Sequence, residues 1–279
     1  MNGAVPRHAV GGYREYAPAP DATGFCEAFW THVPDSGAAA GSAHRVLPDP
    51  AVSLAFRASR DASGAVVDGA VVLIGPKTRA HVFPVDTGVE LSAVRLKLEW
   101  AAPVLGIDPG SIDDQMIDLA IVRPRLNASL LDRLAGTSSP GAALRVLAAA
   151  ILDCAAHSTA PRQSASAALE LMRRSAGRMP LASVAETVGV SVRHLRRQVQ
   201  DAAAVAPKAY GRALRLTQAM RLADRSPAPA WADIAVCTGY CDQSHLIREA
   251  IALAGAPPGH LHTERRLQRV SAAERSNIG

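Results

Sequence analysis

The sequence lacks a long apolar run and contains few cysteines and few aromatic residues. No stretch of eighteen apolar residues occurs, so a helix that spans a membrane is not expected. The first residues lack the apolar core of a signal peptide, so export is not expected either. The only cysteines are Cys26, Cys154, Cys237 and Cys241. Their scarcity and scatter fit a reducing compartment, and we expect a cytoplasmic protein.

Lysine is almost absent from the second half of the chain, where arginine supplies the positive charge. From residue 161 onward there are 17 Lys and Arg against 9 Asp and Glu, a net charge of +8, and Lys208 is the only lysine. Residues 1–160 carry a net charge of −3, which gives the overall +5. This asymmetry points to a polyanionic partner for the C-terminal half, although the base composition of a GC-rich genome is an equal explanation of the arginine content.

One pattern occurs twice in the second half. The first copy covers residues 181–195 (LASVAETVGVSVRHL) and the second covers residues 231–246 (WADIAVCTGYCDQSHL). Each copy has a short apolar helix pattern, then Ala-x-x-x-Gly, then a capping residue and a second helix. A proline follows sixteen residues after the cap in both copies, Pro207 after Ser191 and Pro258 after Asp242.

Each residue type in the pattern has a physical role. Glycine at the end of the first helix can take a positive φ and turn the chain sharply. Ser191 and Asp242 are strong N-caps for the second helix of each copy. Leu195 and Leu246 lie one turn into that helix and point back toward the first. The sequence therefore predicts two helix-turn-helix units, a structure that lays its second helix in a DNA major groove.

Four segments carry a family resemblance: residues 184–197 (VAETVGVSVRHLRR), 207–210 (PKAY), 215–219 (RLTQA) and 239–248 (GYCDQSHLIR). Together they resemble the DNA-binding domain of AraC/XylS-type transcriptional regulators, over roughly residues 164–266. The sequence departs from that family at Val199 and Ala250, where phenylalanine is usual, and at Ala204, where glycine is usual. These departures concern local packing and leave the fold expectation unchanged.

The N-terminal half shows β patterns followed by helix patterns. Alternation at period two predicts strands at 52–56 and 94–98, and turn signals occur at 63–64, 68–69 and 86–88. A capping-box spacing at Ser111 predicts a helix at 116–119, and Asn127 is a candidate cap for another. Residues 140–157 read as one long helix, and we expect a frayed tail after about Arg269.

Residues 13–18 (YREYAP), Trp30 and residues 45–49 (RVLPD) resemble a domain found before AraC-type modules in poorly described regulators. By analogy with the wider family it would be a cupin-like domain that senses a ligand or dimerises. We therefore expect an α+β protein. A β-rich domain at 1–158, a cupin-like barrel or sandwich with helices, would precede an all-α DNA-binding domain at 164–269, in which a connecting helix joins the two helix-turn-helix units.

The candidate base-reading residues lie on the groove faces of the two recognition helices. They are Arg193, Arg196 and Arg197 in the first and Gln243, Ser244 and Arg248 in the second. Arginine matches guanine and glutamine matches adenine, and the resemblance puts base contacts at the same positions. For the second helix, contact with the DNA backbone alone is an equal alternative. Candidate phosphate contacts are Ser191, Lys208, Arg212 and Arg215; for the last three, which lie on the connecting helix, contacts within the domain are the alternative.

We therefore expect a transcriptional regulator that reads two successive major grooves of double-stranded DNA and is not an enzyme. The expected partners are a second copy of the chain, a small-molecule effector of the N-terminal domain and, for an activator, RNA polymerase.

No cofactor or metal is expected, because Cys237, Cys241 and His245 cross a turn without a fourth ligand. The alternative is a DNA-binding module fused to a DNA-repair or other enzyme, with Cys26 as a reactive thiol; a buried core cysteine is the simpler reading. A glycine-rich stretch at 36–41 fits a loop better than a phosphate cradle.

Overall fold

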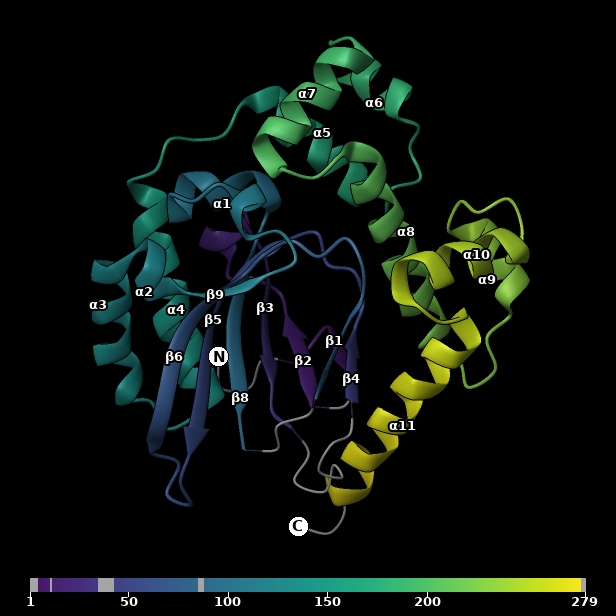
Figure 1. Ribbon diagram of the computed structural model, residues 1–279. Helices are drawn as coiled ribbons and strands as arrows, with labels where there is room; N and C mark the ends of the chain where they lie inside the picture. The colour runs from purple at the N-terminus through teal and green to yellow at the C-terminus, as the bar shows by residue number, and fades with distance from the viewer. Residues whose placement is uncertain (1–4, 11, 35–42, 85–87, 277–279) are drawn as a thin grey trace.

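A computed structural model describes residues 5–10, 12–34, 43–84 and 88–276 (Figure 1). The glycine-rich stretch 36–41 and most of the turn at 86–88 lie outside this part of the chain. Among the helices described, none is both long and apolar enough to cross a membrane.

Antiparallel strands from the N-terminal half form the main sheet. In spatial order they are β1 (His8–Val10), β2 (Tyr13–Tyr16), β3 (Cys26–His32), β8 (Glu90–Leu96), β5 (Val52–Arg60), β6 (Val66–Ile74) and β9 (Met116–Asp118). A second pair consists of β4 (Ala43–Val46) and β7 (His81–Pro84). The turn predicted at 63–64 joins β5 to β6, whereas the turn predicted at 68–69 was wrong, because Asp68 and Gly69 lie inside β6 and pair with β5.

Side-chain alternation gives the main sheet two different faces. On one face, Leu54 and Phe56 pack in a large core with α1 (Leu98–Leu105), α3 (Pro124–Ala135) and α4 (Pro140–Ala156). The short helix α2 (Leu119–Val122) lies between β9 and α3. On the other face, Trp30 and Ala55 form a small separate cluster with Val72 and Ala93. Helices of the N-terminal half therefore cover the first face.

The C-terminal half is all helical and contains two helix-turn-helix units in tandem. Its helices are α5 (Gln163–Arg174), α6 (Leu181–Thr187), α7 (Val192–Ala203), α8 (Pro207–Ala223), α9 (Trp231–Cys237), α10 (Gln243–Ala254) and α11 (Pro258–Ser276). Helices α6 and α7 form the first unit, α9 and α10 form the second, and α8 joins them (Figure 1). The expected fold class, a β-rich region followed by an all-α domain, is confirmed.

The boundary between the two large hydrophobic cores does not coincide with the boundary between the β-rich N-terminal half and the helical C-terminal half. Leu195 and Val199 of α7 belong to the same buried cluster as the N-terminal sheet and its helices. Leu246 and Leu253 of α10 belong to a second cluster, shared with the C-terminal half of α8. The first helix-turn-helix unit is thus fused to the N-terminal core, whereas the second has a core of its own.

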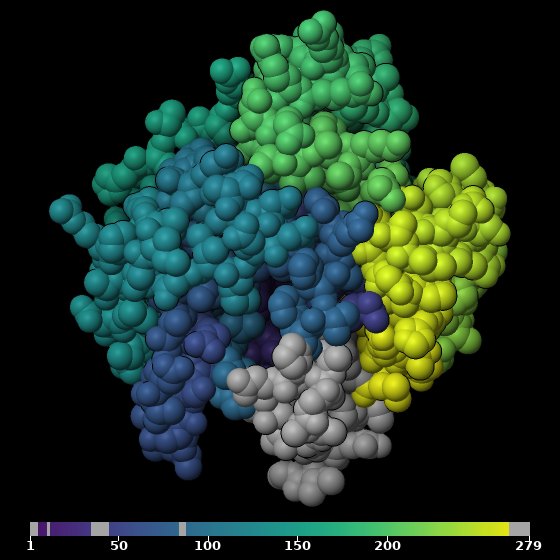
Figure 2. Space-filling model, viewed as in Figure 1, coloured from purple at the N-terminus to yellow at the C-terminus, as the bar shows by residue number. Residues whose placement is uncertain are grey.

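Polar contacts hold the second unit and α11 against the N-terminal half, and Figure 2 shows the yellow C-terminal residues lying against blue N-terminal residues. Arg45 of β4 donates a hydrogen bond to the backbone oxygen of Ala254 at 2.8 Å and pairs with Glu264 of α11 at 3.0 Å. The backbone N–H of Ala80 donates to the oxygen of Leu253 at 2.7 Å.

Three further local predictions were wrong. Met116 begins strand β9 instead of a helix, because residues 116–118 pair with β6 across more than forty positions of sequence. Asn127 lies inside α3, which begins at Pro124, so it is not a cap. The helix expected to fray after Arg269 continues to Ser276, and its last turns contain neither glycine nor proline to end it.

Candidate nucleic-acid interface

The turns of the two units are built alike. Ala185 and Ala235 are buried where the first helix of each unit approaches the second, and their small side chains permit the close crossing. Gly189 and Gly239 have φ values of 72° and 83°, in the left-handed region that glycine enters without steric cost. The sequence pattern therefore marks the sharp turn in each unit correctly.

The second helix of each unit begins at the predicted cap. The Ser191 hydroxyl accepts a hydrogen bond from the backbone N–H of His194 at 3.2 Å. The Asp242 carboxylate accepts one from the N–H of His245 at 2.6 Å. Each cap satisfies an N–H group that the first turn of a helix leaves unpaired, which contributes about 1 kcal/mol.

The recognition helices also end in the same way. Ala204 after α7 has a φ of 55° and Gly255 after α10 has a φ of 74°, and both stand at the same distance from their N-cap. Ala204 is where the AraC/XylS resemblance has glycine, and the structure shows why: an alanine there must adopt a left-handed backbone. Val199 and Ala250, which replace the usual phenylalanines, are fully buried, so smaller side chains fill these core positions.

Three arginines form an exposed face on α7. Leu195 and Val199 are fully buried, whereas Arg193, Arg196 and Arg197 are all exposed. Within the described residues none of these three guanidinium groups forms an ion pair. A guanidinium group without an acidic partner remains free to donate two hydrogen bonds to guanine or to phosphate.

The matching face of α10 is polar but less basic. Gln243, Ser244 and Arg248 are exposed, while Leu246 is fully buried on the opposite side. His245 packs edge-on against the ring of Tyr240, with 5.3 Å between ring centroids, and so lies against the turn. This face offers one amide, one hydroxyl and one guanidinium group to a groove.

The candidate phosphate contacts differ in whether they already form contacts within the protein. Lys208 is exposed at the start of α8. Arg212 pairs with Glu249 of α10 at 2.7 Å, an ion pair that raises the pKa of Arg212, with burial opposing it. Arg215 donates to the backbone oxygen of Gly177 at 2.6 Å. Arg212 and Arg215 therefore hold the helices together, a role that the sequence also allowed.

The sequence patterns gave no indication of two further contacts in this region. Arg178, between α5 and α6, donates to the backbone oxygen of Cys237 at 3.4 Å and so connects the first unit to α9. Glu249 is the α10 partner of Arg212. Both interactions join residues far apart in sequence, and neither belongs to the repeated pattern that identified the two units.

The cysteines show no arrangement for chemistry. No three His, Cys, Asp or Glu side chains in the described part of the chain are grouped to hold a metal ion. Cys26 is buried, and burial raises the pKa of its thiol to about 12, so it carries almost no thiolate at neutral pH. Cys237 and Cys241 are exposed near the turn of the second unit.

Comparison with known proteins supports a two-part organisation. A family model described as a helix-turn-helix domain matches residues 184–271. A second model, described as a domain of unknown function (DUF6597), matches residues 14–118. A search of curated proteins found no match.

Several solved structures are similar. A transcriptional regulator described as containing an AraC-type DNA-binding domain, from Chromobacterium violaceum, is 22% identical, with 37% of this chain and 91% of that chain covered and a TM-score of 0.34. The C-terminal domain of the response regulator AraT from Geobacillus stearothermophilus is 22% identical, covering 37% and 87%, with a TM-score of 0.35. ToxT from Vibrio cholerae is 9% identical, covering 81% and 94%, with a TM-score of 0.44.

Both units have the capped second helix, the positive-φ glycine turn and the left-handed end that the repeated sequence pattern requires. With these features and the family match together, residues 184–271 form a helix-turn-helix domain of AraC type, and a domain that matches a family of unknown function precedes it at residues 14–118.

Proposed function

We propose that this protein binds specific DNA sites by placing α7 and α10 in two successive major grooves. The observation that carries the proposal is the set of exposed arginines on α7, which have no acidic partner among the described residues. Helix α8 has 17 residues and is therefore about 25 Å long. A connecting helix of that length is compatible with recognition helices one DNA turn apart, at about 34 Å.

In this proposal the two recognition helices contribute unequally. Arg193, Arg196 and Arg197 read base edges, with guanine as the preferred partner. In α10, Gln243 suits adenine and Arg248 suits guanine or phosphate, with Ser244 beside them. Because this face is less basic, part of its contribution is to fix the register of the domain on the DNA backbone.

We further propose a division of labour along the chain. Residues 164–269 would bind DNA, and residues 1–158 would control that binding through an effector or through association of two copies. The chain's charge supports this division, because the positive charge is concentrated after residue 160. Two copies could read a repeated site, and an activating form would also contact RNA polymerase.

The first test is a selection of bound sequences from a random duplex pool, with the full chain at near-physiological salt. Salt is needed because phosphate attraction alone retains any DNA at low ionic strength. A motif of two short blocks about one helical turn apart is the expected result. Recovery of no motif would contradict sequence-specific reading.

The second test separates base reading from phosphate attraction. Arg196→Ala should weaken binding to the selected site by about 1–3 kcal/mol and should change binding to random DNA much less. Lys208→Ala is the matched comparison, because loss of a phosphate contact should weaken both DNAs alike and lower the salt dependence. An equal loss on both DNAs for Arg196→Ala would make it a phosphate contact.

A further inference from the structure

A cavity lies on the face of the main sheet opposite α3 and α4. Its volume is about 690 Å³, within the range of small-molecule sites. The sheet side includes Trp30 and Arg95, and the helix side includes Tyr210, Leu214 and Gln218 of α8. The cavity is therefore enclosed by both halves of the chain, and the helix that joins the two DNA-binding units forms part of its wall.

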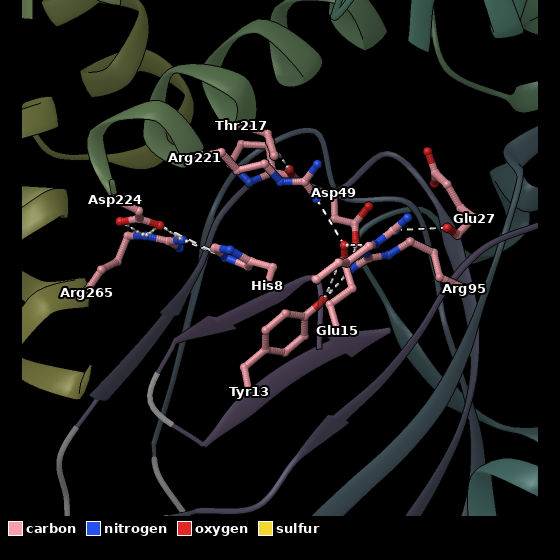
Figure 3. Close-up of polar contacts among 12 residues, drawn as sticks. His8, Tyr13, Glu15, Glu27, Asp49, Arg95, Thr217, Arg221, Asp224 and Arg265 are labelled. Atoms are coloured by element: carbon pink, nitrogen blue, oxygen red, sulfur yellow. Dashed lines mark hydrogen bonds and ion pairs between the residues drawn. The ribbon is translucent and has the colours of Figure 1, made fainter. Parts of the chain in front are cut away.

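The residues of the unexplained N-terminal motifs gather in this cavity. Tyr13 and Glu15 come from the first motif, and Arg45 and Asp49 come from the second; together with Trp30, all of them line it. Figure 3 shows Tyr13, Glu15 and Asp49 converging on Arg95. Sequence segments that are distant from one another thus contribute to one site.

Positive charge dominates the lining. Ten of its residues are Arg or Lys and four are Asp or Glu. Glu15 alone engages three guanidinium groups, at 2.9 Å from Arg7, 2.6 Å from Arg95 and 3.3 Å from Arg221 of α8. Among the described residues, four of the basic residues pair with acidic residues outside the lining, and six do not: the pairs are Arg45 with Glu264, Arg57 with Asp68, Arg173 with Glu99 and Arg265 with Asp224.

In the described part of the chain, one buried donor of the lining has no hydrogen-bond partner. The Nε of Arg95 is buried and makes no hydrogen bond, although the Nη2 of the same side chain pairs with Asp49 at 2.7 Å. Lys77 is 4% exposed; its ammonium group lies over the ring of Phe83, 5.9 Å from the centroid, and forms no ion pair with a described residue. The backbone N–H of Lys77 donates to the backbone oxygen of Asp49 at 2.8 Å, so Lys77 and Arg95 flank the same short segment. A buried donor without a partner is costly, and a bound anion would satisfy the Nε of Arg95 and pair with the charge of Lys77.

The acidic side chains do not cancel this preference. Burial raises the pKa of Glu27, and the positive charge of Arg95 opposes the shift. Elsewhere the wall is apolar, with Leu47, Phe83 and Leu91 among the lining residues.

We propose that this cavity binds a small organic anion with an apolar body, its acidic group directed to the Arg95 and Lys77 side and its body against Trp30 and Leu214. The site itself stands on the cavity and its charges; its role as an effector site rests on the DNA-binding function proposed above. Arg221 of α8 lines the cavity and pairs with Glu15 of the sheet. An occupant therefore contacts the helix that sets the relative position of the two units.

The test uses two dyes of nearly equal shape on the full chain without DNA, measured by equilibrium dialysis. 8-Anilinonaphthalene-1-sulfonate is an anion, and N-phenyl-1-naphthylamine is the same skeleton without the sulfonate. We expect the anion to bind at one site at least tenfold more tightly than the neutral dye. Equal affinities would overturn the proposed ligand class.

Two pairs of variants locate the site. Gln218→Trp fills the cavity from α8 and should weaken anion binding at least tenfold, whereas Gln163→Trp, exposed at the start of α5 and outside the cavity, should not. Arg174→Gln removes an exposed charge of the lining and should weaken binding several-fold, whereas Arg162→Gln, an equal loss of charge beside the same helix, should not.

Arg174→Gln keeps the test decisive if Gln218→Trp does not fold. Unchanged anion binding in Arg174→Gln and in any folded Gln218→Trp would place the dye elsewhere and refute the site. Because no DNA is present, failure here leaves the DNA-binding proposal intact, and failure of the sequence selection leaves the cavity intact.

Discussion

The separate core of the second helix-turn-helix unit leads to a prediction about local stability. Leu246 is fully buried in the cluster that contains α9, α10 and the end of α8. Leu246→Ala removes about three methylene equivalents, or roughly 2.4 kcal/mol of transfer free energy, and leaves a cavity that adds to it. We expect a loss of about 2–5 kcal/mol, which raises the opening equilibrium of this unit by roughly 30-fold or more.

Amide hydrogen exchange measured by peptide segment is the suitable assay, since it reports local opening separately from global unfolding. In Leu246→Ala, exchange should accelerate in α9, α10 and α11 while the sheet and α4 keep the wild-type rates. The reason is that the two clusters of described residues have no buried apolar residue in common: α8, polar contacts and the partly buried Leu47 and Ala80 connect the N-terminal half to the second cluster.

Leu195→Ala is the matched control, because Leu195 is equally buried at the equivalent position of the first unit. Its cluster extends into the N-terminal half, so this change should accelerate exchange in the sheet and α4 as well as in α7. If Leu246→Ala accelerated exchange equally throughout the chain, the two cores would unfold as one and the reasoning would be refuted.

Three further predictions follow from individual residues. Ala204→Gly should raise the free energy of unfolding by about 0.5–1 kcal/mol by relieving a left-handed alanine, and Gly255→Ala at the equivalent position should lower it; chemical denaturation measures both, and a destabilised Ala204→Gly would contradict the strain. Burial raises the pKa of Glu15, but three arginines outweigh burial and hold this pKa well below the ordinary 4.5. The wild-type protein should therefore be more stable than Glu15→Gln by a full margin above pH 4.5, and this margin should shrink as the pH falls below 4.5. A difference in stability that stays constant with pH would contradict the prediction. A thiol reagent should label Cys237 rapidly in the folded protein and Cys26 only on unfolding, and rapid labelling of Cys26 would revive a reactive-thiol function.

The DNA-binding units could be predicted from sequence because their determinants are local. A cap, a glycine turn and a leucine one turn later lie within eight residues of one another, and each imposes its own short-range constraint. The same locality explains the error at Ser111, where a genuine capping-box spacing precedes a strand. Pairing of Met116 with Ile74 on β6 decides the structure there, and no short-range signal reports it.

The cavity could not be predicted because its determinants are long-range. Tyr13, Glu15 and Asp49 stood out in the sequence only through a weak resemblance, without an assigned role. Their role in the cavity depends on contacts with Arg95 and Arg221. Glu15 and Arg221 are 206 positions apart in the chain. Charged residues with distant partners look like ordinary surface charges until the fold brings them together.

Helix α8 offers a direct physical route from the N-terminal half to the second recognition helix. Tyr210 is buried in the core that includes the sheet, whereas Leu216 and Met220 are buried in the core of the second unit. Between these anchors, Leu214 and Gln218 face the cavity. An occupant that moves α8 must therefore change the position of α10 relative to α7. Because successive major grooves have a fixed spacing, such a change would alter affinity for a two-block site while leaving the affinity for either block alone nearly constant.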